Sequence, residues 1–127
     1  MRRSWPTPKA TELRILFDKN VPVGVRRFLQ KHEVHTVVDL KWNPQLENGE
    51  LLDAAEAAGF DVMVTADQNI RYQQNLTGRK LSLVVIGSNI WPIVQKHSDA
   101  VASKVDAATP GSYEFIEMPI RPRAKSQ

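Results

Sequence analysis

The sequence contains no cysteine, so disulfide bonds and thiolate metal sites are excluded at once. Long apolar runs are also missing, and the longest are as short as Leu83-Val84-Val85-Ile86. A helix that crosses a membrane needs roughly 20 apolar residues, so no such span is expected. The basic start of the chain is not followed by the apolar stretch of a signal peptide. We therefore expect a cytoplasmic protein with no membrane association.

Acidic residues are absent from both ends of the chain. Residues 1–9 and 121–127 each hold three basic residues and no acid, whereas the whole chain has 17 basic and 14 acidic residues. Without these six basic residues, 11 basic and 14 acidic residues remain, so the sequence pI of about 9.4 comes from the ends. Basic ends of this kind either hold nucleic acid loosely or serve as solubilising, flexible segments.

The length and the alternation of apolar patterns predict one α/β domain. A chain of 127 residues with 42% hydrophobic residues suits a single core. We expect a flexible basic arm at 1–10, the domain at 11–120 and a basic tail at 121–127. Strands are expected at 14–19, 34–40, 61–67, 81–87 and, at the sheet edge, 113–118, and helices at 22–31, 49–58 and 91–107, with a helix or turn at 69–76. Strands that alternate with helices favour a mainly parallel sheet with helices on both faces.

Three acidic residues stand where such a fold would bring them together. Asp18 and Asp67 end two strand-like runs, and Glu50 lies near the start of a helix. Crevices that bind ligands lie beyond the carboxyl ends of parallel strands, where the strand order reverses. Carboxylates that converge there repel one another unless a cation joins them, and Mg²⁺ or Mn²⁺ prefers oxygen ligands. The pattern predicts a metal site of Asp18, Glu50 and Asp67, with Asn69 as an outer, water-mediated ligand.

Local roles would explain the same acids without a metal. Asp18 could cap the helix that follows it, Glu50 could favour a helix N-terminus and Asp67 could start a turn. A phosphatase that acts through Asp18 would want a second aspartate at position 20, where the sequence has Asn20. The histidines show no metal-ligand spacing and are expected to be surface or packing residues.

An amide-rich run follows Asp67 and extends from Gln68 to Asn75. Amide side chains such as that of Gln73 can contact phosphate, sugar or base edges. Tyr72 can stack on an unpaired base, or it can pack on the core of a solvated turn. The run is therefore either a nucleic-acid contact or a turn.

Four segments of this chain resemble PIN-like proteins of the DUF5615 class. They are 15–22 (ILFDKNVP), 48–52 (NGELL), 60–69 (FDVMVTADQN) and 72–76 (YQQNL). The resemblance spans roughly residues 13–95 and implies a three-layer α/β/α PIN-like fold. It also implies a Mg²⁺- or Mn²⁺-dependent ribonuclease, such as the toxin of a toxin–antitoxin pair. The family often has a further acid near the third, and Asn69 in that region should weaken binding of a second metal ion.

The resemblance makes Asp18, Glu50 and Asp67 the acidic metal ligands and catalytic residues. RNA is then the expected substrate, an antitoxin protein is an expected partner, and a homodimer could form through Trp42 or Trp91, although core packing explains a tryptophan as readily. The alternative is a catalytically inert module that binds protein or RNA. The residues expected to contact nucleic acid are Lys19, Asn20, Arg71, Tyr72, Gln73, Arg79 and Lys80.

Overall fold

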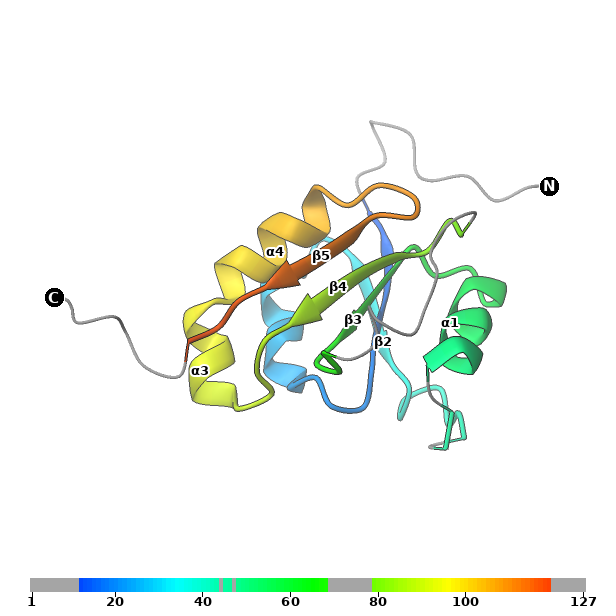
Figure 1. The fold of residues 1–127 in the computed structure, drawn as a ribbon, viewed down its shortest axis with the longest axis horizontal. Helices are drawn as coiled ribbons and strands as arrows, with labels where there is room; N and C mark the ends of the chain where they lie inside the picture. Colours follow the sequence, from blue (N-terminus) through cyan, green and yellow to red (C-terminus); the bar gives the residue numbers. More distant parts are fainter. Residues whose placement is uncertain (1–11, 44, 47, 69–78, 120–127) are drawn as a thin grey trace, which may run out of the picture.

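The computed structural model describes residues 12–43, 45–46, 48–68 and 79–119. These residues form one five-stranded sheet with helices packed against it (Figure 1). The elements in chain order are β1 (Arg14–Phe17), the 3₁₀ helix η1 (Val23–Phe28), β2 (Glu33–Thr36), α1 (Asn48–Ala57), β3 (Val62–Thr65), β4 (Ser82–Ile86), α3 (Trp91–Lys96), α4 (Ser98–Asp106) and β5 (Tyr113–Ile116).

All the strand pairings in this sheet are parallel, and the strand order is β2-β1-β3-β4-β5. The strand β2 pairs with one edge of β1, and the later strands β3, β4 and β5 lie in order on the opposite side of β1. The strand order therefore reverses at β1, and the β1/β3 boundary is the switch point of a doubly wound sheet. This topology places the expected ligand crevice beyond the carboxyl ends of β1 and β3.

The side chains of each strand alternate between two hydrophobic cores, as the period of two in a strand requires. Ile15 and Phe17 of β1 face the core that η1, α3 and α4 cover, whereas Leu16 faces the core that α1 covers. The strands β3 and β4 alternate in the same way. Figure 1 shows α1 on one side of the sheet and α3 and α4 on the other. The predicted three-layer α/β/α fold with a parallel sheet is therefore confirmed.

The helix expected at 22–31 is shorter and more tightly wound than predicted. It forms a 3₁₀ helix from Val23 to Phe28. Gly24 and two β-branched valines are poor formers of an α-helix. Glycine is required for packing here, because a Cβ at Gly24 would lie only 2.6 Å from the Trp91 ring. This close approach seats η1 against α3.

Two further differences from the sequence prediction exceed a shift of one or two residues at the end of an element. The helix expected at 91–107 is divided at His97, where φ is −112°, and the Ser98 hydroxyl donates to the Val94 carbonyl. A hydroxyl that bonds back to the preceding turn favours a bend in a helix. The strand expected at 34–40 ends at Thr36 instead, because the chain turns directly after it. The expected arm, the expected tail and the segment at 69–76 fall outside the described residues.

Candidate functional site

Asp18 and the loop that carries Asp67 lie side by side at the carboxyl edge of the sheet. Phe17 is in register with Val64, so Asp18, the next residue, is level with Thr65. The Asp18 backbone N–H donates to the Val64 carbonyl at 2.9 Å and extends the ladder by one step. The structure therefore places the ends of these two strands together at the switch point.

Thr65 connects the two aspartates through its hydroxyl group. Its Oγ1 donates to Asp18 Oδ2 at 2.8 Å and accepts the Asp67 backbone N–H at 3.1 Å. Thr65 is fully buried, whereas both aspartates are half-buried. The other carboxylate oxygen of Asp18 accepts the Lys19 backbone N–H at 2.7 Å. The Asp18 carboxylate is thus held by a hydrogen bond on each oxygen.

Asn20 makes a second link between the same strand ends. Its Oδ1 accepts the Ala66 backbone N–H at 2.9 Å, across 46 residues of sequence. Asn20 was predicted to contact nucleic acid, and the structure gives its amide oxygen a partner within the protein. The loops after β1 and β3 are therefore joined by side-chain hydrogen bonds beyond the end of the backbone ladder.

Glu50 lies in the first turn of α1, where its side chain is exposed. Because α1 leads from the end of β2 back to the start of β3, its first turn belongs to the carboxyl edge of the sheet. Within the described ranges, however, no three Asp, Glu or His side chains lie close enough together to hold a metal ion. The structure brings the strand ends of Asp18 and Asp67 together, and the complete trio stays a prediction.

The donor atoms at the two strand ends suit a hard divalent cation. Carboxylate oxygens of Asp18 and Asp67 are the ligands that Mg²⁺ and Mn²⁺ prefer, and Mg²⁺ commonly binds through one or two carboxylates and several waters. Each carboxylate oxygen has two lone pairs, so the hydrogen bonds to Asp18 leave room for a cation. Asn69, the expected outer ligand, lies outside the described residues.

Where the structure describes them, the residues expected to contact nucleic acid fall at two opposite edges of the sheet. Lys19 is exposed beside Asp18, but Arg79 and Lys80 precede β4 at the amino-terminal edge of the sheet. Through the registers of β4, β3 and β1, Lys80 lies about five residues, or roughly 16 Å, behind Asp18 along the strand direction. Arg71, Tyr72 and Gln73 lie outside the part of the chain that the structure describes.

Arg79 already has anionic partners on α1. Its guanidinium group donates to Asp53 at 2.7 Å and to Glu56 at 3.1 Å. Burial opposes the charge, but these hydrogen bonds raise the pKa of Arg79 above its usual value. Its charge is therefore balanced within the protein, at the far edge from the aspartates.

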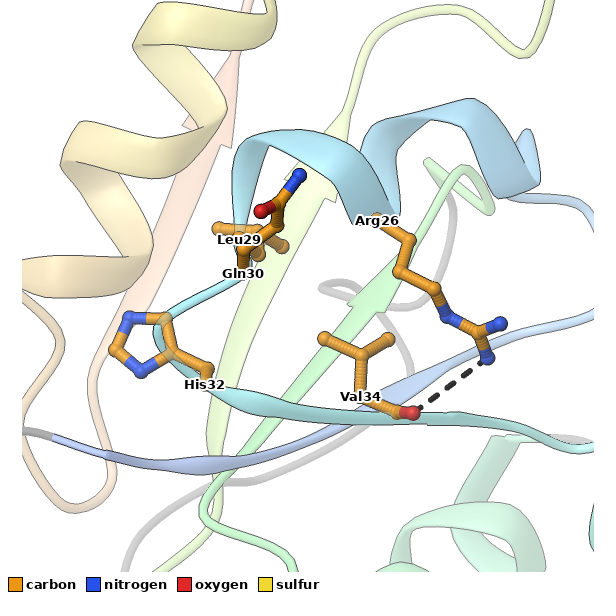
Figure 2. A pocket seen from close by; sticks show the side chains of 5 residues that line it. All are labelled: Arg26, Leu29, Gln30, His32 and Val34. Atoms are coloured by element: carbon orange, nitrogen blue, oxygen red, sulfur yellow. Dashed lines mark hydrogen bonds between the residues drawn. The ribbon is translucent and has the colours of Figure 1, made fainter.

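A separate hollow of about 510 Å³ lies between η1 and β2 (Figure 2). Arg26, Leu29, Gln30, His32 and Val34 line it. His32 is buried, with Nδ1 accepting the Leu13 N–H at 3.0 Å and Nε2 bonded to Asp106 at 2.8 Å. Both ring nitrogens are therefore engaged in contacts within the fold.

The tryptophans considered for a dimer interface both contact the described core. The Trp91 ring lies over Gly24, and Trp42 meets Phe60 edge to face with ring centroids 6.3 Å apart. Both are nevertheless only partly buried. The homodimer therefore stays a prediction.

Sequence reasoning missed the connecting role of Thr65. The available signal was its position two residues before Asp67, because a threonine hydroxyl can accept the backbone N–H two residues on. Gln68 was also missed as a structural residue, although its amide donates to the Gly87 carbonyl at 3.0 Å and joins the ends of β3 and β4.

None of the described helices is long and apolar enough to cross a membrane. Comparisons with family models, curated proteins and solved structures find no match to this chain.

Proposed function

We propose that this protein is a Mg²⁺- or Mn²⁺-dependent ribonuclease of the PIN-like class. The observation that carries the proposal is the position of Asp18 and Asp67 at neighbouring strand ends, at the switch point of a parallel sheet. Two carboxylates there, with the Thr65 hydroxyl between the Asp18 side chain and the Asp67 backbone, form an oxygen-rich site for a hard cation.

Each residue of the site has a stated role in this proposal. A bound ion would activate water and stabilise the negative charge that develops on the phosphate. Asp18 and Asp67 bind the ion through carboxylate oxygens. Glu50, exposed at the start of α1, is either a third ligand or the carboxylate that positions the attacking water. Lys19, exposed next to Asp18, meets the RNA backbone.

The proposed partners follow from this activity. This protein would then act on RNA in the cytoplasm, and in a toxin–antitoxin pair an antitoxin protein would silence the site. The basic residues at both ends of the sequence would add electrostatic attraction to the RNA backbone.

A catalytically inert module that binds protein or RNA is the second candidate. It is favoured by the hydrogen bonds that the protein itself supplies to both oxygens of Asp18. It is also favoured by the exposed position of Glu50, outside any three-acid group among the described residues. In this candidate the aspartates only fasten the ends of β1 and β3.

A metal titration tests the proposal. At a Mn²⁺ concentration a hundredfold above Kd, binding to the folded state adds about 2.7 kcal/mol of stability. The wild-type Tm should then rise by roughly 10 °C. Asp18→Asn combined with Asp67→Asn should abolish this rise and the cleavage of RNA. Asn at position 18 can still accept the Thr65 hydroxyl, so the fold should persist.

The exposed Asp99 of α4 provides the control. Asp99→Asn should leave the Mn²⁺ response unchanged. An equal rise in Tm in the double variant would show that the ion binds elsewhere and would contradict the proposed site. Metal binding without RNA cleavage would favour the inert module.

A further inference from the structure

Two hydrogen bonds within the protein join the ends of β1 and β3, and they form without a metal ion or a substrate. The Thr65 hydroxyl bonds Asp18 across 47 residues of sequence, and Asn20 bonds the Ala66 backbone across 46. Asp18, Asn20 and Ala66 all lie beyond the last residues of the strands. The two bonds therefore fix loops that a parallel sheet would otherwise leave free to separate.

The directions of the Thr65 hydrogen bonds follow from the chemistry of the groups. An ionised carboxylate only accepts, so the single hydroxyl proton of Thr65 goes to Asp18. A lone pair of the same oxygen then accepts the Asp67 N–H. Thr65 is fully buried, so its side chain has little freedom to turn away. One hydroxyl thus fixes the side chain of one aspartate and the backbone of the other.

We propose that Thr65 and Asn20 are positioning residues that set the spacing of Asp18 and Asp67 before any ion binds. This inference rests on the proposed function, because it concerns the metal affinity of the same site. Two like charges at neighbouring strand ends disfavour each other, so an empty site needs contacts within the protein to hold Asp18 in place. Thr65 and Asn20 hold the Asp18 carboxylate and the backbone of the Asp67 loop in place for the ion.

Substitution of Thr65 tests the inference. Thr65→Val keeps the shape of the side chain but removes the hydroxyl group. Loss of a partner that orients a metal ligand typically lowers metal affinity by about 10- to 100-fold. We expect Thr65→Val to weaken Mn²⁺ binding by that factor in calorimetric titration. Thr65→Ser, which keeps the hydroxyl, should avoid this loss of about 10- to 100-fold.

Thr36 offers a matched control at the end of the neighbouring strand β2. It is also buried, and its hydroxyl accepts the Asp39 N–H at 2.8 Å, within the turn that follows β2. Thr36→Val makes the same chemical change at a buried strand end. It should cost stability as Thr65→Val does and leave the Mn²⁺ affinity unchanged. Comparison of the two variants therefore separates a general loss of stability from a specific loss of Mn²⁺ affinity.

Amide hydrogen exchange measures the same restraint in the metal-free protein. Thr65→Val should speed exchange of the Asp67 amide, and Asn20→Ala should speed exchange of the Ala66 amide. If Thr65→Val does not fold, the Mn²⁺ affinity is measured with Asn20→Ala instead. It removes only the half-buried link between the loops and should lower Mn²⁺ affinity as well.

The outcomes separate this inference from the proposed function. Mn²⁺ binding that Asp18→Asn abolishes but that Thr65→Val and Asn20→Ala leave unchanged would overturn the positioning role and leave the metal site intact. Binding that is identical in wild type and Asp18→Asn would overturn the metal site and the inference together.

Discussion

A single histidine joins three separate parts of the described fold. The Leu13 N–H donates to His32 Nδ1, so this nitrogen carries no proton and Nε2–H donates to Asp106. His32 is therefore the neutral Nε2–H tautomer, and its contact with Asp106 is a hydrogen bond between a neutral ring and a carboxylate. The start of β1, the start of β2 and the end of α4 meet at this ring.

Replacement of His32 by alanine should destabilise the protein. The buried Leu13 N–H would lose its acceptor, which costs about 1–3 kcal/mol. His35 is the matched control, because it is partly exposed and its ring bonds Glu33 at 2.7 Å. His35→Ala should cost less than about 1 kcal/mol. Equal losses in urea unfolding would contradict the structural role assigned to His32.

At the scale of elements, the apolar pattern of the sequence was sufficient to predict the central strands of the sheet. The strands β1, β3 and β4 are short, mostly apolar runs, and buried parallel strands have this pattern. The break at His97 was not predictable, because it depends on the bond from Ser98 to Val94 rather than on apolar spacing. The 3₁₀ winding of η1 is coupled to its packing against Trp91, a residue far along the chain.

The stability that Asp106 contributes at the end of α4 should decrease in acid. Asp106 ends this helix, where the helix dipole disfavours a negative charge. Partial burial also opposes the charge, but hydrogen bonds from His32 and Lys31 hold the pKa of Asp106 below its ordinary value of 3.8. The stability that this carboxylate contributes is therefore present above about pH 4 and is lost as the pH falls through its folded pKa.

Unfolding measured between pH 6 and pH 3 checks this expectation. Wild type should be more stable than Asp106→Asn at pH 6, and the difference between the two free energies of unfolding should shrink below about pH 4. A difference that stays constant over this range would show that the Asp106 charge contributes nothing.

At the scale of the whole molecule, contacts within the protein cover the carboxyl-terminal part of the outer edge of β2. Thr36 N–H donates to Asp39 at 3.3 Å, and the Thr36 carbonyl accepts the Leu40 N–H at 3.1 Å. Arg26 reaches from η1 to Asp39 at 2.8 Å and to the Val34 carbonyl at 3.5 Å, as the dashed line in Figure 2 shows for Val34. Edge strands that lack such protection pair with other chains.

Removal of this protection should promote self-association. Asp39→Ala frees the Thr36 N–H and releases Arg26, so we expect species larger than those of wild type in light scattering at high protein concentration. Arg27 is exposed beside Arg26 and provides the control, because Arg27→Ala removes a charge without opening the edge. Identical size distributions for wild type and Asp39→Ala would contradict the protective role.

The candidate site was predictable to the extent that it follows from topology. Parallel neighbours end at one edge, so two acids that end neighbouring strands must approach each other, as Asp18 and Asp67 do. Side-chain partners depend on contacts between distant residues, and the bond from Thr65 to Asp18 could not be predicted from the sequence. Charge alone also did not show that Arg79 lies at the opposite edge, paired with α1.

The strand order has a consequence for the biosynthesis of the protein. Asp18 is synthesised 47 residues before its partner Thr65, and α1 lies between the two in the sequence. A ribosome that has translated only β1 and β2 holds a nascent chain in which Asp18 still lacks the strand that carries its partner. The strand ends that carry Asp18 and Asp67 come together only when β3 docks against β1, so any activity of this edge has to wait for that step.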